Sequence, residues 1–167
     1  MCYAILREDQ WTILRDIRLI ALKDSPDSFL STYDKEFDYD ETRWRSEFSR
    51  GEWIIAKQDG HVVAIVGAVS GYDVPDNDRY LEYLWVSPEV RGSGVAPSLI
   101  QTVLRRLKAA EIGTVWLWIL DGNDPARKLY DKCGFTSTGK RQPLPNSTIC
   151  EERMNMALNS IKATDER

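Results

Sequence analysis

The stretch that decides the fold covers residues 80–96 and reads YLEYLWVSPEVRGSGVA. Its first seven residues form an apolar run typical of a buried strand, interrupted once by Glu82. Gly92 and Gly94 follow, directly before a segment with helical periodicity. Glycines at such a place let the backbone turn sharply and expose N–H groups, and a helix N-terminus adds about half a positive charge. The stretch therefore predicts a strand, an anion-binding loop and a helix, a combination that cradles a pyrophosphate.

Two common nucleotide-binding motifs do not account for this loop. A P-loop requires the pattern GxxxxGK[ST], which the chain lacks. The dinucleotide pattern GxGxxG/A would place its third small residue where Pro97 stands. Proline supplies no N–H group, so one potential phosphate donor is missing, but proline fits the first turn of a helix sterically.

Outward from this loop, apolar periodicity predicts an alternation of strands and helices. The segment 114–120 is apolar at successive positions, so we expect it to be buried on both faces. Strands are expected at Tyr3–Leu6, Trp53–Lys57, His61–Ser70, Arg79–Val86, Thr114–Leu120, Phe135–Gly139 and Cys150–Leu158. Helices are expected from Trp11 to the Ser25-Pro26 stop and at Phe29–Phe37, Thr42–Phe48, Ser93–Ala110 and Asp124–Lys132.

The order of these elements predicts a mixed α/β fold. The Asp59-Gly60 turn between two strands indicates a hairpin, and residues 79–120 form a strand–helix–strand unit whose strands are parallel. A chain of 167 residues is long enough for one well-buried core and short for two, so we expect one domain over residues 1–167. The polar residues 159–167 are expected to form a tail.

Composition excludes several classes of protein. The hydrophobic fraction of 43% and charged fraction of 29% are those of a globular chain. With 22 basic and 26 acidic residues, the net charge of -4 disfavours a nucleic-acid partner. Cys2, Cys133, Cys150 and the single histidine can form neither a disulfide framework nor a zinc site, so we expect no metal and a reducing cytoplasmic location. The longest apolar run, residues 62–69, is far below the roughly 18 residues of a membrane span, so no membrane partner is expected.

Two motifs in order resemble the GCN5-related N-acetyltransferase (GNAT) superfamily. Val86-Ser87-Pro88 followed by Arg91 to Ala96 is similar to the family's strand ending V-x-P and its Q/R-x-x-G-x-G/A loop. A second block resembles N-x-x-A-x-x-L-Y-x-x-x-G-F, with Asn123, Ala126, Leu129, Tyr130, Gly134 and Phe135 at its positions. The resemblance is specific over about residues 79–135.

The resemblance implies a GNAT-like fold and acetyl-CoA as cosubstrate. That fold has a central, mostly antiparallel sheet with one splayed parallel strand pair, flanked by helices. Residues 1–50 would belong to the acceptor side and residues 79–135 to the acetyl-CoA-binding core. The expected coenzyme-binding residues are backbone groups of Leu84, Trp85 and Val86, the loop Arg91, Gly92, Ser93, Gly94, Val95 and Ala96, and the side chains of Asn123 and Tyr130.

Glu82 is the candidate general base. An alkylamine has a pKa near about 10.4 and is mostly protonated at neutral pH, so a group that removes its proton is useful. Glutamate is seldom placed in an apolar strand without a reason. The alternative is a structural carboxylate at a sheet edge, or one paired with Arg79 or a nearby tyrosine.

Tyr130 matches the family's tyrosine that donates a proton to the coenzyme thiolate. The alternative is an ordinary core tyrosine on the apolar face of its helix. Asn123 is placed either to cap this helix or to contact the coenzyme. Cys133 is expected to pack, because no second histidine is present to activate a thiol nucleophile.

The acceptor side is less determined. Phe29, Tyr33 and Glu82 are the candidate acceptor-binding residues, in a region whose aromatic and acidic residues would suit an ammonium group. The alternative is that its aromatic residues belong to the core and its acidic residues face solvent. The acidic residues are Asp34, Glu36, Asp38, Asp40 and Glu41.

The leading hypothesis is an N-acetyltransferase that moves the acetyl group directly to a primary amine of a small molecule or to a protein or peptide amino group. The alternative is a non-catalytic acyl-CoA-binding sensor or interaction module. A nucleotide-binding enzyme is a third possibility, disfavoured by the missing P-loop lysine and by Pro97. A homodimer is possible, since residues 154–158 alternate as a pairing strand would.

Overall fold

The computed structural model describes residues 1–158, so the expected tail at 159–167 lies outside the described residues. Its strands pair in the order β1-β2-β3-β4-β5-β7-β6. The described residues form two compact units, one of residues 1–69 and 81–100 and the other of residues 70–80 and 101–158. The expected mixed α/β fold with a mostly antiparallel sheet and one parallel strand pair is confirmed.

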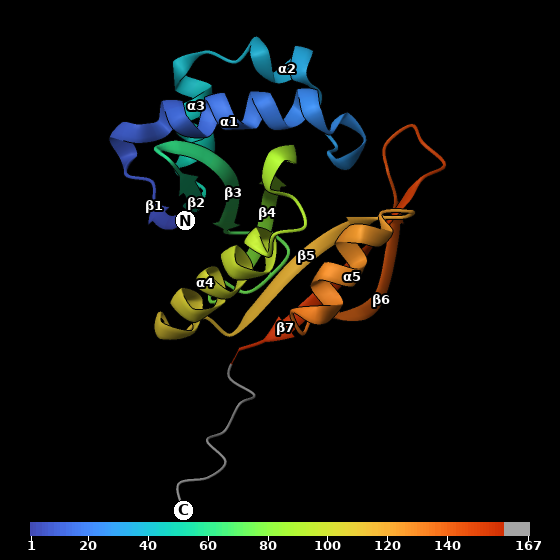
Figure 1. Ribbon diagram of the computed structural model, residues 1–167. Coiled ribbons are helices and arrows are strands. Elements are labelled where there is room, and N and C mark those ends of the chain that lie inside the picture. Colours follow the sequence, from blue (N-terminus) through green and yellow to red (C-terminus); the bar gives the residue numbers. More distant parts are fainter. Residues whose placement is uncertain (159–167) are drawn as a thin grey trace, which may run out of the picture. The chain divides into compact units, whose positions relative to one another are not determined.

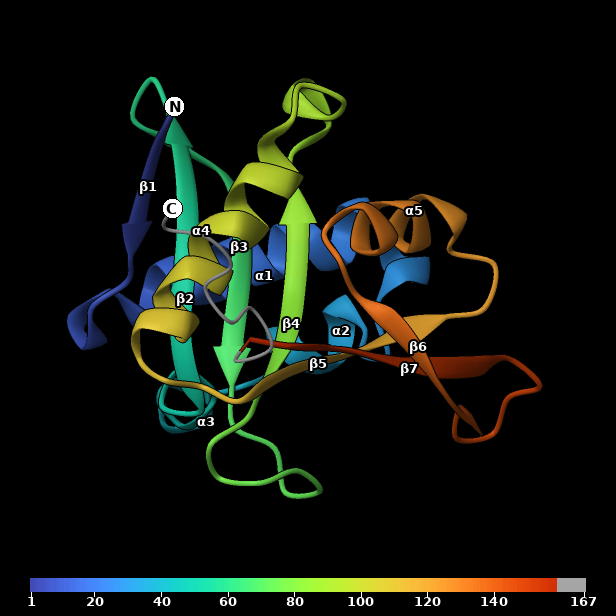
Figure 2. The same cartoon turned by 90° about the horizontal axis from the view of Figure 1, so that it is seen from below.

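The first unit contains the N-terminal helices and the antiparallel strands. Figures 1 and 2 show α1 and the beginning of α4 on opposite faces of β3. Its core is built on fully buried apolar side chains of α1, β2 and β3. Its elements are β1 (Cys2–Ile5), α1 (Trp11–Asp24), α2 (Tyr33–Phe37), α3 (Glu41–Phe48), β2 (Gly51–Gln58), β3 (His61–Val69), β4 (Arg79–Val86) from Leu81 onward, and α4 (Val95–Ala109) up to Ile100.

The expected helix at Phe29–Phe37 is wrong over its first half. The chain makes a short 3₁₀ turn at Pro26–Ser28, and α2 begins only at Tyr33. Thr32 is the reason, because its side-chain oxygen accepts a hydrogen bond from the Lys35 N–H at 3.3 Å and so caps α2.

A buried ion pair joins α1 to α2. The Arg18 guanidinium donates through Nε and Nη2 to the two carboxylate oxygens of Glu36 at 2.9 and 2.8 Å. Both side chains are at most 4% exposed, and the guanidinium also lies over the Phe29 ring at 4.6 Å. The expectation that the acidic residues of this region face solvent is therefore wrong for Glu36.

The second unit contains β5 (Thr114–Leu120), α5 (Asp124–Lys132), β6 (Thr136–Pro143) and β7 (Cys150–Ala157). Strand β7 pairs antiparallel with both β5 and β6, and α5 lies against one face of these strands (Figure 1). Val115, Leu117 and Ile119 are buried, while Trp116 and Trp118 between them are half-buried. The expectation that this strand is buried on both faces is therefore wrong.

Strand β4 is shared by the two units. It pairs parallel with β5 only at Arg79↔Val115 and Tyr80↔Trp116, and the residues from Leu81 onward belong to the first unit. The turn before it is held by Asp78, whose carboxylate accepts hydrogen bonds from the Thr114 N–H and the Trp116 indole N–H, both at 2.9 Å. The expected parallel pair is thus confirmed, and its ladder is two residues long.

The ion pair between α1 and α2 generates a stability prediction. Glu36→Gln leaves the buried Arg18 cation without its counter-ion, so the free energy of unfolding is expected to fall by about 3–5 kcal/mol in urea titrations. The matched control is Asp34→Asn, an exposed carboxylate on the same helix, expected to change stability by about 0.5 kcal/mol or less. Equal effects of the two substitutions would contradict the assigned role of the pair.

Candidate functional site

The backbone of β4 is irregular at Tyr83, where φ is +60°. A left-handed residue within a strand breaks the alternation by which successive side chains point to opposite faces. The Glu82 carboxylate and the Tyr83 hydroxyl accordingly reach the same cluster of charged groups, formed with Glu47 and Arg50. The alternation rule predicts opposite faces for Glu82 and Tyr83, and that prediction is wrong here.

Arg50 is the centre of this cluster. Its two terminal nitrogens lie 2.9 Å from the two carboxylate oxygens of Glu82, and Nη1 is 3.1 Å from Oε2 of Glu47. Arg43 pairs with the other oxygen of Glu47 at 2.9 Å, and the Tyr83 hydroxyl donates to Glu47 at 3.4 Å. Two arginines thus balance two carboxylates in a half-buried site.

The cluster is tightly coupled. Burial lowers the pKa of Arg50, but the hydrogen bond and the charges of Glu82 and Glu47 outweigh burial and raise that pKa above its usual value. Burial also raises the pKa of Tyr83, so its hydroxyl keeps its proton. The alternative that pairs Glu82 with Arg79 is not what the structure shows, because the Arg79 guanidinium donates to the carbonyls of Asp76 and Asp78.

The glycine-rich loop follows β4 in the same unit. Gly92 and Gly94 have φ values of +76° and +87°, and a Cβ added to either would meet no atom within 4 Å. These glycines are required by the backbone conformation and leave open space above it. Helix α4 begins directly afterwards, at Val95, so its unpaired first-turn N–H groups follow the loop, an arrangement chemically suited to an anion; the loop and this first turn are called the anion cradle. Pro97 stands in the first turn of α4, where its missing N–H breaks no intrahelical bond.

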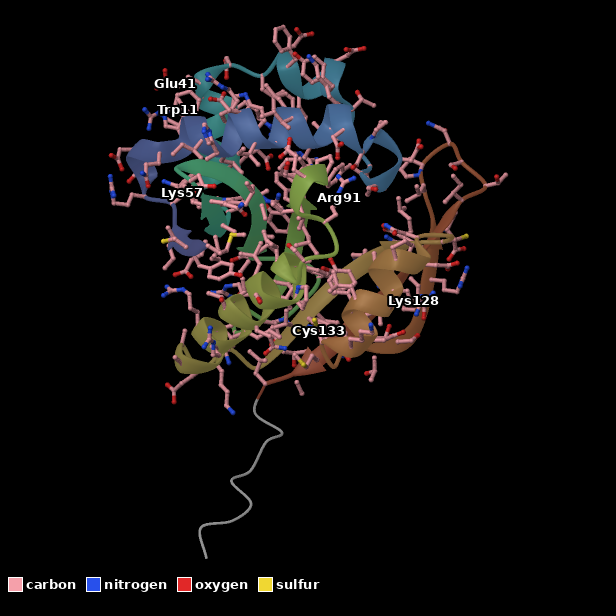
Figure 3. All side chains as sticks on the ribbon, in the orientation of Figure 1. Trp11, Glu41, Lys57, Arg91, Lys128 and Cys133 are labelled. Carbon is pink, nitrogen blue, oxygen red and sulfur yellow. The ribbon has the colours of Figure 1, made fainter. Side chains whose placement is uncertain are left out.

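The end of β4 leads into this cradle. Trp85 is buried and Val86 is half-buried, like Leu84. The Val86 carbonyl accepts a hydrogen bond from Nε of Arg91 at 2.9 Å. Figure 3 shows the Arg91 side chain beside the end of α1, where it pairs with Asp24. The Arg91 side chain is thus already engaged within the protein, as is that of Ser93, whose hydroxyl donates to the Val90 carbonyl.

The second unit carries two further candidates, Asn123 and Tyr130. Asn123 caps α5, because its side-chain oxygen accepts from the Ala126 N–H at 3.3 Å. Tyr130 is 8% exposed, and its ring packs edge-on against Phe135 with centroids 5.7 Å apart. Burial raises the pKa of Tyr130, so its hydroxyl is a proton donor over the neutral range.

The acceptor-side candidates are engaged by cations of the chain itself. Phe29 packs on the Arg18 guanidinium, and Tyr33 lies 4.1 Å from Nζ of Lys23 and stacks on Phe37. Both are half-buried, so their rings retain some exposed surface.

Groups suited to other chemistry are sparse in residues 1–158. No cluster of three or more metal-ligating side chains is found there, and no helix in that range has the length and apolar character to cross a bilayer. Cys133 is 8% exposed and burial raises the pKa of its thiol, as a packing residue requires.

Sequence reasoning missed Arg50, Glu47 and Asp24. Arg50 stands 32 positions before Glu82, and Asp24 stands 67 positions before Arg91. No local pattern links such pairs. The signal that could have found Arg50 is the need of a half-buried Glu82 for a cationic partner.

Comparison with known families decides the classification. Residues 14–135 match the family described as "Acetyltransferase (GNAT) family". The chain belongs to the GNAT family. The resemblance of the two motifs is thereby confirmed.

The relatives found include a [ribosomal protein bS18]-alanine N-acetyltransferase of Haemophilus ducreyi, 35% identical over 78 residues, which are 45% of this chain and 53% of the relative. An uncharacterized N-acetyltransferase of Mycobacterium bovis is 33% identical over 90 residues, 53% of this chain and 54% of that protein. The chain thus spans about half the length of these curated relatives.

Among solved structures, the yncA protein of Salmonella typhimurium, determined with its cofactor acetyl-CoA, has the same fold. Its TM-score is 0.76 at 15% identity, with 99% of this chain and 98% of that chain covered. At this identity the likeness is one of fold.

The anion cradle predicts a specific response to a glycine substitution. Gly94→Ala forces an L residue into the left-handed region and is expected to reshape the cradle, weakening the affinity for coenzyme A, used as a pyrophosphate-bearing probe, by about tenfold or more in calorimetric titration. Gly60→Ala is the matched control, with φ of +83° in the β2–β3 turn and equally open space. Both variants are expected to lose about 1–2 kcal/mol of stability. Equal affinities in the two variants would contradict the cradle.

Proposed function

We propose that this protein is an acetyl-CoA-dependent N-acetyltransferase that transfers the acetyl group directly to a primary amine. The observation that carries the proposal is the segment from Glu82 to Ala96, which holds a cation-bound carboxylate at one end and an anion cradle at the other. Family membership supports the same activity. We propose this activity for the protein as a whole, although the chain spans only about half the length of its curated relatives.

The loop residues fit a pyrophosphate group. The open space above Gly92 and Gly94 and the amides at the start of α4 would receive the phosphates, and backbone groups of Leu84, Trp85 and Val86 would receive the pantetheine arm. Acetyl-CoA, when bound, supplies an acetyl group as a thioester that an amine can attack. Asn123 caps α5 and so supports Tyr130, whether or not it also touches the coenzyme.

Glu82 is the residue that takes a proton from the acceptor ammonium, directly or through a water molecule. Its carboxylate is 32% exposed, so it is reachable, and Arg50 fixes both of its oxygens. A negative charge held in place also attracts the ammonium form of an acceptor. Arg50 therefore acts as a positioning residue for Glu82.

Tyr130 is the residue that returns a proton to the leaving thiolate. A phenol whose pKa is raised by burial keeps its proton at neutral pH and is available to donate it. Glu82 is a proton acceptor in the first unit and Tyr130 a proton donor in the second, and a purely coenzyme-binding module would need neither. This favours the enzyme over the alternative of a sensor or interaction module.

The acceptor class is proposed from chemistry and from one relative. An amine of a small molecule and a protein or peptide amino group both suit a fixed carboxylate. Because one relative is named as an alanine N-acetyltransferase of ribosomal protein bS18, peptides with free N-termini are included in the test panel. Phe29 and Tyr33 are proposed to contact the acceptor.

We also propose a reducing cytoplasm as the location, which suits the three free cysteine thiols. We expect the protein to form a single domain over residues 1–167, to take neither a metal nor a nucleic-acid partner, and to be able to form a homodimer.

The direct test is thiol release from acetyl-CoA over a panel of polyamines, amino acids, aminoglycosides and peptides with free N-termini. Turnover is expected with one class and is expected to fall by about 100-fold in Glu82→Gln, because the proton acceptor is lost. Glu8→Gln, an exposed carboxylate, is the matched control and is expected to behave as wild type. Coenzyme A binding without turnover on any acceptor would favour the binding module, and wild-type turnover in Glu82→Gln would remove the role of Glu82.

A second prediction concerns the proton donor. Tyr130→Phe is expected to lower kcat by about 100-fold and to leave the affinity for coenzyme A unchanged, because only the hydroxyl is removed. Tyr72→Phe, at a fully exposed tyrosine, is the control. Burial raises the pKa of Tyr130 above the ordinary value of about 10, so its hydroxyl stays protonated below that pH. Ionisation of Tyr130 is therefore expected to cause no loss of wild-type activity below about pH 10. Unchanged kcat in Tyr130→Phe would refute the assignment.

A further inference from the structure

Asp24 is the last residue of α1, and one of its carboxylate oxygens accepts hydrogen bonds from three donors. The Trp85 indole N–H donates to Oδ2 at 2.9 Å, the Ser25 hydroxyl donates to it at 2.7 Å, and Nη2 of Arg91 forms an ion pair with it. Its side chain is 23% exposed. These contacts join the end of α1, the end of β4 and the start of the glycine-rich loop at one point.

Arg91 is fixed by this arrangement. Besides Asp24, its guanidinium donates through Nε to the Val86 carbonyl at 2.9 Å and through Nη2 to the Ser25 hydroxyl at 3.3 Å. A planar guanidinium that donates from Nε and Nη2 to three groups at once is restricted to few rotamers, even though the Arg91 side chain is 47% exposed. Its positive charge is already balanced by Asp24, so its main contribution to the loop is geometric.

The loop needs such a restraint. Gly92 and Gly94 give the chain after Arg91 a large conformational freedom, which must be lost when the loop takes one shape. Ser93 supplies a local restraint, since its hydroxyl donates to the Val90 carbonyl at 2.6 Å. Asp24 supplies a restraint from a different element, 67 positions earlier in the chain.

The sign of the charge excludes a direct role in anion binding. A carboxylate close to a phosphate site would repel the phosphate, so Asp24 is out of place there unless it acts through its cationic partner. The hydrogen bonds from Ser25 and Trp85, together with Arg91, hold the pKa of Asp24 below its usual value against the opposing effect of burial. Asp24 therefore carries its charge at neutral pH and keeps Arg91 in place.

We propose that Asp24 is a positioning residue for the acyl-CoA donor: by tying Arg91 to the end of α1, it holds residues 91–96 in the shape that receives the pyrophosphate. This inference rests on the proposed function, since it presupposes that the loop binds the coenzyme. It predicts that Asp24 contributes to coenzyme affinity without touching the coenzyme.

The test is a double-mutant cycle on the dissociation constant of coenzyme A, measured by titration calorimetry on the whole chain. Asp24→Asn keeps an oxygen for Trp85 and Ser25 but removes the charge that holds Arg91, so affinity is expected to fall about tenfold, or about 1.4 kcal/mol. Arg91→Gln removes the same tie from its other end and is expected to have a similar effect. The double variant is expected to bind no more weakly than the weaker single variant, because the two residues act as one unit.

Two further measurements separate positioning from a general loss of structure. The ratio of kcat/KM for acetyl-CoA to that for S-acetylpantetheine, which lacks the pyrophosphate, is expected to fall about tenfold in Asp24→Asn, whereas a structural defect would lower both values alike. Asp27→Asn, an exposed carboxylate three positions later, is the control expected to bind as wild type.

The outcomes distinguish this inference from the proposed function. Wild-type protein that binds coenzyme A, with Asp24→Asn binding equally well, would overturn the role of Asp24 alone. Additive losses in the double variant would also overturn it, because Asp24 would then act independently of Arg91. Wild-type protein that does not bind coenzyme A would overturn the proposed function and this inference together.

Discussion

In β4 the backbone turns left-handed at Tyr83, and the arrangement of the site follows from that residue. A regular strand would send Glu82 and Tyr83 to opposite faces. The irregular strand brings both to Glu47 and Arg50, so that a carboxylate, a phenol and a guanidinium converge in a half-buried place. Left-handed backbone costs energy in a bulky residue and persists only where the surroundings hold it. The surroundings of Tyr83 hold both its hydroxyl, which donates to Glu47, and its ring, whose centroid lies 3.7 Å from the Arg18 guanidinium.

Helix α1 braces β4 at two points. Near its middle, Arg18 packs on the Tyr83 ring while paired with Glu36 of α2. At its end, Asp24 holds the Trp85 indole and the Arg91 guanidinium. One helix therefore fixes both the strand that carries Glu82 and the loop that follows it, and both contacts depend on charged groups that are balanced within the protein.

Much of this could be predicted from sequence because it is local. The Asp59-Gly60 hairpin, the limits of β5 and α5, and the strand–loop–helix order around Gly92 and Gly94 depend on periodicity and on backbone requirements of neighbouring residues. The conformation of Tyr83 could not be predicted, because its apolar neighbours fit a regular strand equally well. Arg50 and Asp24 could not be predicted either, since their partners are brought to them only by the tertiary fold.

A double-mutant cycle on kcat/KM with the preferred acceptor, over wild type, Arg50→Gln, Glu82→Gln and the double variant, tests the central claim that the β4 cluster acts as one unit. Because Arg50 acts through Glu82, Arg50→Gln is expected to lower kcat/KM by about tenfold in the wild-type background and to cause no further loss once Glu82 is replaced. Glu47, Tyr83 and Arg43 face the same cluster and are unchanged in all four proteins. Wild-type activity in Arg50→Gln, or losses that add in the double variant, would contradict the claim that Arg50 holds Glu82 ready for proton transfer.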